Sequence, residues 1–278
     1  MDNNKYKGEN LMGEKVPITE EMKALGWAKY YDKPLAPVPK EKLKFLENPL
    51  ETGDILRIED RNRLFEPGYL AAEVGYGVLE DGSGYIANLT PMPGVTTEMF
   101  DWWFAWHGLG DLRYTIWDPE DHYYAKSLNA AQGKCPKLSL KEKYWGTTHL
   151  IKEDIGGGPD ELFATFRQPQ EMGFDEEKIG TKACGTIVTS NSGTVADPSA
   201  MSVVMCHFVR ETEDGIELRS RFWLGWHIVA GKPVKILPDG AATPLIQPKM
   251  LLAHNMKEFQ NLADLLPRIY PEQKDNWE

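Results

Sequence analysis

Near its C-terminus the chain places two polar residues on an otherwise apolar helical stripe. The stripe runs through Leu251, His254, Glu258, Leu262 and Leu265. His254 and Glu258 stand four residues apart, so a helix puts both side chains on one face. Because an unpaired carboxylate is costly to bury, the pair requires a partner, and His with Glu is a natural ligand pair for a divalent metal ion. An exposed His–Glu pair on a solvated helix face is the alternative interpretation.

Two further residues could complete a metal site. His122 follows the acidic run DPED at 118–121, and Glu153 lies in THLIKEDI, where His149, Ile151 and Glu153 alternate onto one face of a strand. Together with His254 and Glu258 they supply two nitrogens and two carboxylates. That ligand set suits zinc, and less specifically iron or manganese.

Two other histidines are candidates for proton transfer. His207 alternates with Val203, Met205 and Val209 along one strand face. An inward-facing histidine there is either a hydrogen-bonded core residue or an acid–base group, since imidazole titrates near working pH. His107 ends a tryptophan-rich segment and is a second candidate. Its alternative role is to complement the helix dipole.

The elements that must position these residues follow from the apolar pattern. Runs rich in β-branched or aromatic residues, separated by Gly and Asp, predict strands within 53–58, 69–79, 84–89, 112–117, 148–155, 162–167, 184–190, 201–210 and 215–229. A helix is predicted for Thr97–His107, and a long amphipathic helix for Pro248–Leu266, ended by Pro267. The order predicts an α+β fold in which a curved antiparallel sheet grips the C-terminal helix, with a cavity between them.

The first part of the chain lacks the strand pattern of the rest. Residues 1–52 predict a partly helical arm, with helices over Glu20–Tyr31, capped by Thr19, and Lys40–Glu47 on either side of a proline-rich link. We expect this arm to pack against a partner subunit and so to make the protein a homo-oligomer, most simply a dimer. Residues 53–278 are then the catalytic domain.

Composition excludes several classes of function. The 278 residues carry 31 Lys and Arg against 42 Asp and Glu, a net charge of −11, which disfavours nucleic acid and anionic membranes. No apolar run is long enough to span a membrane, and no secretory signal pattern begins the chain, so we expect a cytoplasmic protein. The three cysteines form no CxxC motif and are expected to be unpaired. P-loop, GxSxG and HExxH motifs are absent.

At this point the candidate ligands resemble a known metal site. His122, Glu153 after 31 residues, and His254 with Glu258 in HNMKE are similar to the ligands of the family of 2,4-diacetylphloroglucinol and phloretin hydrolases. The segments FDWWFAWHGL, LRYTIWDPEDHYY and SRFWLGWH strengthen the resemblance, which covers roughly residues 50–265. It implies a Bet v 1-like helix-grip fold, a zinc ion at the base of an aromatic cavity, and hydrolysis of the carbon–carbon bond between an acyl group and a phloroglucinol ring.

The resemblance also implies roles for individual residues. His207 corresponds to a histidine that faces the substrate, and Tyr114 to a tyrosine that binds a ring hydroxyl. Trp103 and His107 would belong to the aromatic wall around the substrate, a small phenolic ketone. Because four protein ligands already fill a tetrahedral zinc site, we expect Glu153 to be the weakly bound ligand and to carry protons.

Two departures from the diacetylphloroglucinol hydrolases concern the substrate. Phe222 and Ala125 stand where those enzymes have a second hydroxyl-binding tyrosine and an asparagine, which favours a differently substituted acyl-phloroglucinol such as phloretin. Two other functions stay open, because fold alone does not fix function. A carrier of hydrophobic ligands would need no metal, and an iron-dependent oxygenase would consume dioxygen.

Overall fold

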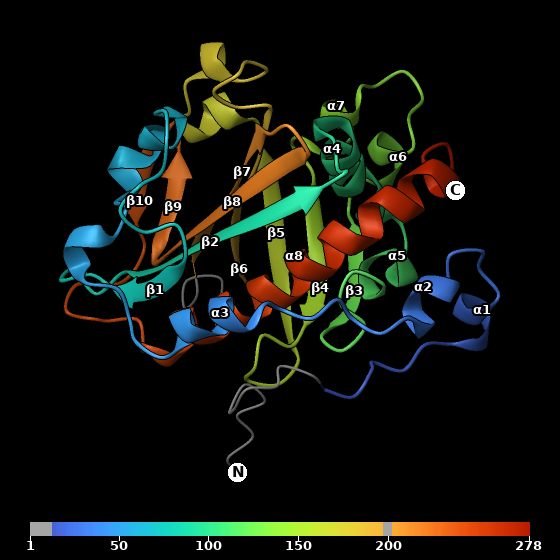
Figure 1. Cartoon of the computed structure of the whole chain (residues 1–278), viewed down its shortest axis with the longest axis horizontal. Coiled ribbons are helices and arrows are strands. Elements are labelled where there is room, and N and C mark those ends of the chain that lie inside the picture. Colours follow the sequence, from blue (N-terminus) through green and yellow to red (C-terminus); the bar gives the residue numbers. More distant parts are fainter. Residues whose placement is uncertain (1–12, 197–201) are drawn as a thin grey trace.

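A single antiparallel sheet of eight strands organises the molecule (Figure 1). The computed structural model describes residues 13–196 and 202–278. The strand order is β1-β2-β8-β7-β6-β5-β4-β3, and all neighbouring strands are antiparallel. The strands are β1 (Gly75–Val78), β2 (Gly84–Pro93), β3 (His122–Ser127), β4 (Thr148–Glu153), β5 (Asp160–Arg167), β6 (Thr186–Thr194), β7 (Val203–Glu211) and β8 (Gly215–Leu224); a separate pair is formed by β9 (Trp226–Val229) and β10 (Lys232–Lys235).

Both faces of the sheet are covered. In β7, Met205 and His207 face the long C-terminal helix, whereas Cys206 and Phe208 face the opposite side. That opposite side carries a second apolar cluster, which includes residues of the 3₁₀ helix η3 (Ile58–Phe65). A strand that is buried on both faces can be apolar on both, and β7 shows little polar alternation. β8 alternates instead: Phe222 faces the helix side, whereas Arg219 and Arg221 face the opposite side and pair with Glu73.

The C-terminal helix α8 (Ile246–Gln273) crosses one face of the sheet (Figure 1). It continues through Pro267 and Pro271, so the predicted end at Pro267 is wrong. Proline removes one backbone hydrogen bond, but Leu266 and Ile269 beside it are fully buried in the core, and their packing holds the helix together. A curved antiparallel sheet around one long C-terminal helix confirms the predicted α+β helix-grip architecture.

Several predicted strands differ from the structure. Residues 112–117 form the helix α5 (Asp111–Thr115), because a short apolar run carries too few residues to separate a period of two from a helical one. Segment 53–58 pairs with no strand among the described residues and overlaps η2 (Thr52–Asp54). The run 215–229 divides into β8 and β9 at Gly225, whose φ is 90°.

The remaining helices are shorter than α8. The predicted helix at 97–107 is α4 (Thr97–Trp106), capped by the hydroxyl of Thr96, and it continues into η4 (His107–Leu109). The other helical segments are α6 (Ala130–Gly133), α7 (Leu140–Tyr144), η5 (Pro169–Met172) and η6 (Glu176–Lys178). None of the helices in the described part of the chain is long and apolar enough to cross a membrane. The three cysteines are free, as predicted.

The N-terminal segment packs on its own chain. The single helix predicted for Glu20–Tyr31 is instead two short ones, α1 (Glu20–Lys23) and α2 (Lys29–Asp32), while α3 (Lys40–Leu43) and η1 (Lys44–Leu46) occupy the second predicted helix. Trp27 contacts Trp106 edge to face, with ring centroids 5.8 Å apart, and Lys29 pairs with Glu272 at 2.7 Å. The division at residue 52 and the dimer stay predictions.

Candidate metal centre and cavity

The structure brings the four predicted metal ligands together. His122 begins β3 and lies directly opposite Glu153 in the register of β3 and β4. From α8, His254 and Glu258 approach the same point. The Nε2 atom of His122 lies 3.3 Å from Nε2 of His254, 3.8 Å from Oε2 of Glu153 and 3.7 Å from Oε2 of Glu258.

These separations fit a small cation at their centre. Nε2 of His254 lies 4.0 Å from Oε2 of Glu153 and 3.9 Å from Oε2 of Glu258. A regular tetrahedron with metal–ligand bonds of about 2.0–2.1 Å has ligand–ligand distances of about 3.3–3.4 Å. Modest movements of two carboxylates would therefore close the four atoms around a zinc-sized ion.

Hydrogen bonds from the other ring nitrogens orient both histidines. Nδ1 of His122 donates to the carbonyl of Tyr114 at 3.3 Å, and the Tyr114 ring stacks on the imidazole with centroids 4.0 Å apart. Nδ1 of His254 donates to Oδ2 of Asp121 at 3.4 Å. Each Nε2 is thereby left to face the shared point, which is the usual support of metal-binding histidines.

Asp118 is a further candidate ligand that the sequence reasoning did not select. It is fully buried, and its Oδ2 has no hydrogen-bond partner among the residues that the structure describes. Asp118, His122 and His254 each offer one ligand atom within 4.8 Å of the others, so this cluster could hold a metal ion. The acidic run before His122 was the available signal.

The buried carboxylates and imidazoles of the candidate site perturb one another's pKa values. Burial raises the pKa of Glu258 to about 8, and the nearby charge of Glu153 adds to the effect. Burial alone would lower the pKa of His254, but the hydrogen bond to Asp121 and the charge of Glu258 outweigh it and raise the pKa to about 10. The metal-free site therefore retains protons, in the place where a divalent cation would supply the missing positive charge.

A cavity opens above these residues. It measures about 930 Å³ out to its open mouth, and Tyr114, Glu153, His254 and Glu258 line it. Away from them the wall is largely apolar, with Ile151, Ile155, Leu162, Phe163, Ala164, Val203, Met205, Leu224 and Leu251. A deep polar end and an apolar remainder are typical of a site for a small aromatic ligand.

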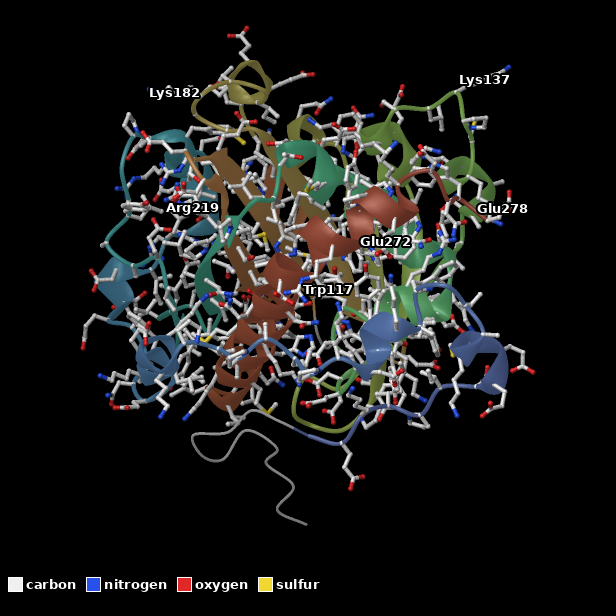
Figure 2. All side chains as sticks on the ribbon, turned by 45° about the vertical axis from the view of Figure 1, so that its right-hand side comes forward. Trp117, Lys137, Lys182, Arg219, Glu272 and Glu278 are labelled. Atoms are coloured by element: carbon white, nitrogen blue, oxygen red, sulfur yellow. The ribbon has the colours of Figure 1, made fainter. Side chains whose placement is uncertain are left out.

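The predicted substrate residues divide into two groups. His107, Tyr114, His207 and Phe222 line the cavity, but within the described part of the chain its wall does not include Trp103 or Ala125, which are fully buried. Trp103 lies one layer behind, stacked on His107 with centroids 6.2 Å apart, and the Trp117 ring crosses it at 5.8 Å. Figure 2 shows Trp117 in the middle of the molecule, beside α8.

Both cavity histidines outside the metal cluster are neutral. Burial lowers the pKa of His207 to about 3, well below the range in which a free imidazole titrates. Its Nδ1 shares a hydrogen bond with the hydroxyl of Ser220 at 2.9 Å. Burial likewise lowers the pKa of His107 to about 4, and its Nδ1 donates to the carbonyl of Trp103 at 2.9 Å.

Tyr114 has a contact that the sequence did not indicate. Its hydroxyl donates a hydrogen bond to Oε2 of Glu153, the same oxygen that faces the two histidines. Burial and the charge of Glu153 raise the pKa of the phenol well above its ordinary value. Tyr114 thus remains a hydrogen-bond donor and fixes the orientation of Glu153.

Comparison with known sequences identifies the family. The DAPG hydrolase PhiG domain matches residues 55–271. The chain belongs to the DAPG hydrolase family. It is 42% identical to phloretin hydrolase of Eubacterium ramulus over 95% of this chain and 96% of that protein. It is 30% identical to 2,4-diacetylphloroglucinol hydrolase of Pseudomonas protegens over 88% of this chain and 84% of that protein. Membership of this family makes the chain a hydrolase that acts on a small molecule.

Solved structures resemble this hydrolase loosely. A crystal structure of Ara h 8.0201 aligns with 69% of this chain and 99% of its own length, at 9% identity and a TM-score of 0.39. A norcoclaurine synthase of Thalictrum aligns with 73% of this chain and 99% of its own length, at 13% identity and a TM-score of 0.37.

Proposed function

We propose that this protein hydrolyses the carbon–carbon bond between a ketone acyl group and a phloroglucinol ring, using zinc held by His122, Glu153, His254 and Glu258. The observation that carries the proposal is the convergence of two imidazoles and two carboxylates at the base of an aromatic cavity. Two relatives are hydrolases named for phloretin and for 2,4-diacetylphloroglucinol, which supports the substrate class.

The reaction needs a proton on the ring and a hydroxyl on the acyl group. Protonation of the acyl-bearing ring carbon gives a keto tautomer, so that the ring leaves as an enolate when water attacks the ketone carbon. Water supplies both the hydroxyl of the carboxylic acid and the proton that restores the phenol. A bound divalent ion would supply Lewis acidity toward substrate or water oxygens.

The residues of the cavity fit distinct parts of this scheme. His207 is neutral, so its imidazole can donate or accept a hydrogen bond, and we assign it the orientation of the attacking water. Tyr114 keeps its proton and can donate a hydrogen bond to Glu153 or to a ring hydroxyl of the substrate. Glu153 is the more accessible carboxylate, with 14% of its side chain exposed against 9% for Glu258, and we assign it the proton transfer to the ring.

The cavity wall favours a substrate with a long apolar arm. Phe222 puts an apolar ring beside His207, with centroids 5.6 Å apart, where a hydroxyl-binding tyrosine would suit a second acetyl group. The apolar wall toward the mouth gives room for the aryl-propanoyl arm of phloretin. Phloretin is therefore the proposed substrate, cleaved to phloroglucinol and an arylpropanoic acid.

Metal content and activity test the proposal together. Protein purified without chelator should hold about one zinc per chain and cleave phloretin to products in equal amounts. His122→Ala and His254→Ala should each lose both the metal and the activity while they keep the fold. His227→Ala is the matched control, because His227 contacts Ser192 and does not line the cavity in the described part of the chain.

Each alternative function predicts a different result. A carrier would bind phloretin without cleaving it and would refuse zinc, and an oxygenase would hold iron and lose activity without dioxygen. A fully active, fully metallated His254→Ala protein would contradict the ligand assignment. We further propose a cytoplasmic homodimer, which sedimentation of the purified protein at micromolar concentration would test for the oligomeric state.

A further inference from the structure

A buried lysine lies behind the metal cluster. Lys257 stands on α8 between His254 and Glu258, and only 3% of it is exposed. Its Nζ atom lies 3.3 Å from Oδ1 of Asp118 and 3.3 Å from Oε2 of Glu120. Its shortest contact is with Oδ2 of Asp121. The ammonium group of Lys257 thus contacts three carboxylates, all of them from the loop 118–121.

The Asp121 carboxylate connects this lysine to a metal ligand. The Oδ2 atom that contacts Lys257 is also the atom that accepts the hydrogen bond from Nδ1 of His254. An aspartate in that position fixes the ring and the tautomer of a ligating histidine. Lys257 in turn fixes the aspartate, since a charged hydrogen bond in a dry site is strong and directional.

The same loop also sets the position of the other histidine. The backbone N–H groups of Asp121 and His122 both donate to the carbonyl of Asp118, at 3.1 and 2.9 Å. The loop is therefore a tight turn that ends at His122 in the first position of β3. Because Lys257 holds this turn from α8, it joins the two elements that carry the two imidazoles.

The N-terminal segment closes the outer side of this cluster. The backbone N–H of Gly13 donates to Oε2 of Glu120 at 2.7 Å, and that of Val16 donates to the carbonyl of Pro119 at 2.7 Å. These hydrogen bonds hold the N-terminal segment over the loop 118–121 and help to exclude water from it. In a region of low dielectric constant the attraction between Lys257 and its carboxylates is strengthened.

We propose that Lys257 is a positioning residue of the metal site, which acts through Asp121 to hold His254 against His122. The proposal rests on the proposed function, because it assumes that the two histidines bind zinc. It assigns no contact between Lys257 and substrate or metal. Its consequence is that the zinc affinity of the site depends on a side chain outside the ligand set.

The test is a thermodynamic cycle on zinc affinity. Lys257→Met, Asp121→Asn and the double variant are titrated with zinc in competition with a chromophoric chelator, and the melting temperature of each metal-free protein is recorded. Loss of an outer partner of a metal-binding histidine weakens binding by about 10–100-fold. We expect that loss for each single variant and little further loss for the double variant, because both changes remove one support.

Two variants separate positioning from simple structural support. Lys42→Met is the matched control, since Lys42 is another buried lysine, bound to the carbonyl of Leu89 at 2.7 Å and to the hydroxyl of Thr90 at 3.0 Å. It should lower the melting temperature and leave the zinc dissociation constant unchanged. Lys257→Arg keeps the charge and should regain most of the affinity.

The outcomes are decisive in each direction. Unchanged zinc affinity in Lys257→Met, or additive losses in the double variant, would overturn the proposal while the wild-type zinc content still supports the proposed function. A wild-type protein without zinc affinity would overturn both. If Lys257→Met does not fold, the double variant Glu120→Gln/Lys257→Met takes its place, because it removes one charge of each sign. Unchanged zinc affinity in this double variant would likewise overturn the proposal, and weakened affinity would support it.

Discussion

Replacing Glu258 with glutamine should weaken metal binding and at the same time stabilise the metal-free protein. The carboxylate is buried, with Oε1 accepting a hydrogen bond from the Asn255 amide at 2.9 Å and Oε2 facing His122 and His254. Glutamine has the same shape and keeps the Oε1 contact. It removes the negative charge that a cation needs, and it also removes the cost of burying that charge.

The magnitude follows from the pKa of the buried carboxyl. Burial raises the pKa of Glu258 from 4.5 to about 8, so its contribution to the stability of the metal-free fold is lost progressively as pH rises from 4.5 to 8. At pH 7 the fold holds a proton that the unfolded chain has released, at a cost of about 3 kcal/mol. Glutamine needs no such proton uptake, so the metal-free variant should gain up to about 3 kcal/mol, at about 2–4 °C in melting temperature per kcal/mol.

The assay compares melting temperatures with chelator and with saturating zinc at pH 7. The metal-free Glu258→Gln protein should melt above the metal-free wild type, and zinc should raise its melting temperature far less. Glu73→Gln is the matched control of opposite sign. Burial would raise the pKa of Glu73, but the hydrogen bond from Arg219 and the charge of Arg221 lower it to about 2, so losing that charge destabilises the fold. If the metal-free Glu258→Gln protein melts below the wild type, the reasoning about buried charge is refuted.

Three further predictions concern the cavity. Tyr114→Phe keeps the ring stacked on His122 but removes the hydrogen bond to Glu153. We expect kcat/KM for phloretin to fall about 10–100-fold, because a hydrogen bond to a charged group contributes about 1.5–3 kcal/mol. Metal analysis should find the zinc content unchanged. Phe222→Tyr restores a hydroxyl beside His207 and should raise the ratio of kcat/KM for 2,4-diacetylphloroglucinol over phloretin by about tenfold, one hydrogen bond of about 1.4 kcal/mol; an unchanged ratio would argue against Phe222 as a specificity residue. Burial lowers the pKa of His107 from 6.5 to about 4, so as pH falls below 6.5 the unfolded chain takes up a proton at this residue and the folded chain does not. Between pH 7 and 5 this difference should lower the free energy of unfolding by about 2 kcal/mol. The His107→Phe protein should not show that loss.

The fold was predictable wherever a long periodic pattern covered the element. The stripe through Leu251 and Leu262 predicts α8, and runs rich in β-branched or aromatic residues predict β7 and β8. The β-branched and aromatic content of segment 112–117 predicts a strand, yet the same residues form one turn of a buried helix. Tertiary contacts decide such short segments, and so they lie beyond pattern alone.

The sequence indicates the candidate ligands of the site but not the residues that support them. Unexpected polar residues on an apolar stripe pointed to His254 and Glu258, because burial without a partner is costly. Asp121 lies in an acidic turn, and Lys257 lies between two candidate ligands. From the sequence alone, either position could equally well be exposed to solvent. Only the packing of α8 on loop 118–121 shows that both are buried and paired.

The division of the proposed ligands between two distant parts of the chain bears on how the protein would take up its metal. β3 and β4 alone bring together His122 and Glu153 as register partners, and two ligands make a weak, open site. The third and fourth arrive only when α8 docks, after all eight strands have been synthesised. Tight metal capture should therefore be a late event in biosynthesis, and metal retention would report on whether the last helix has closed over the sheet.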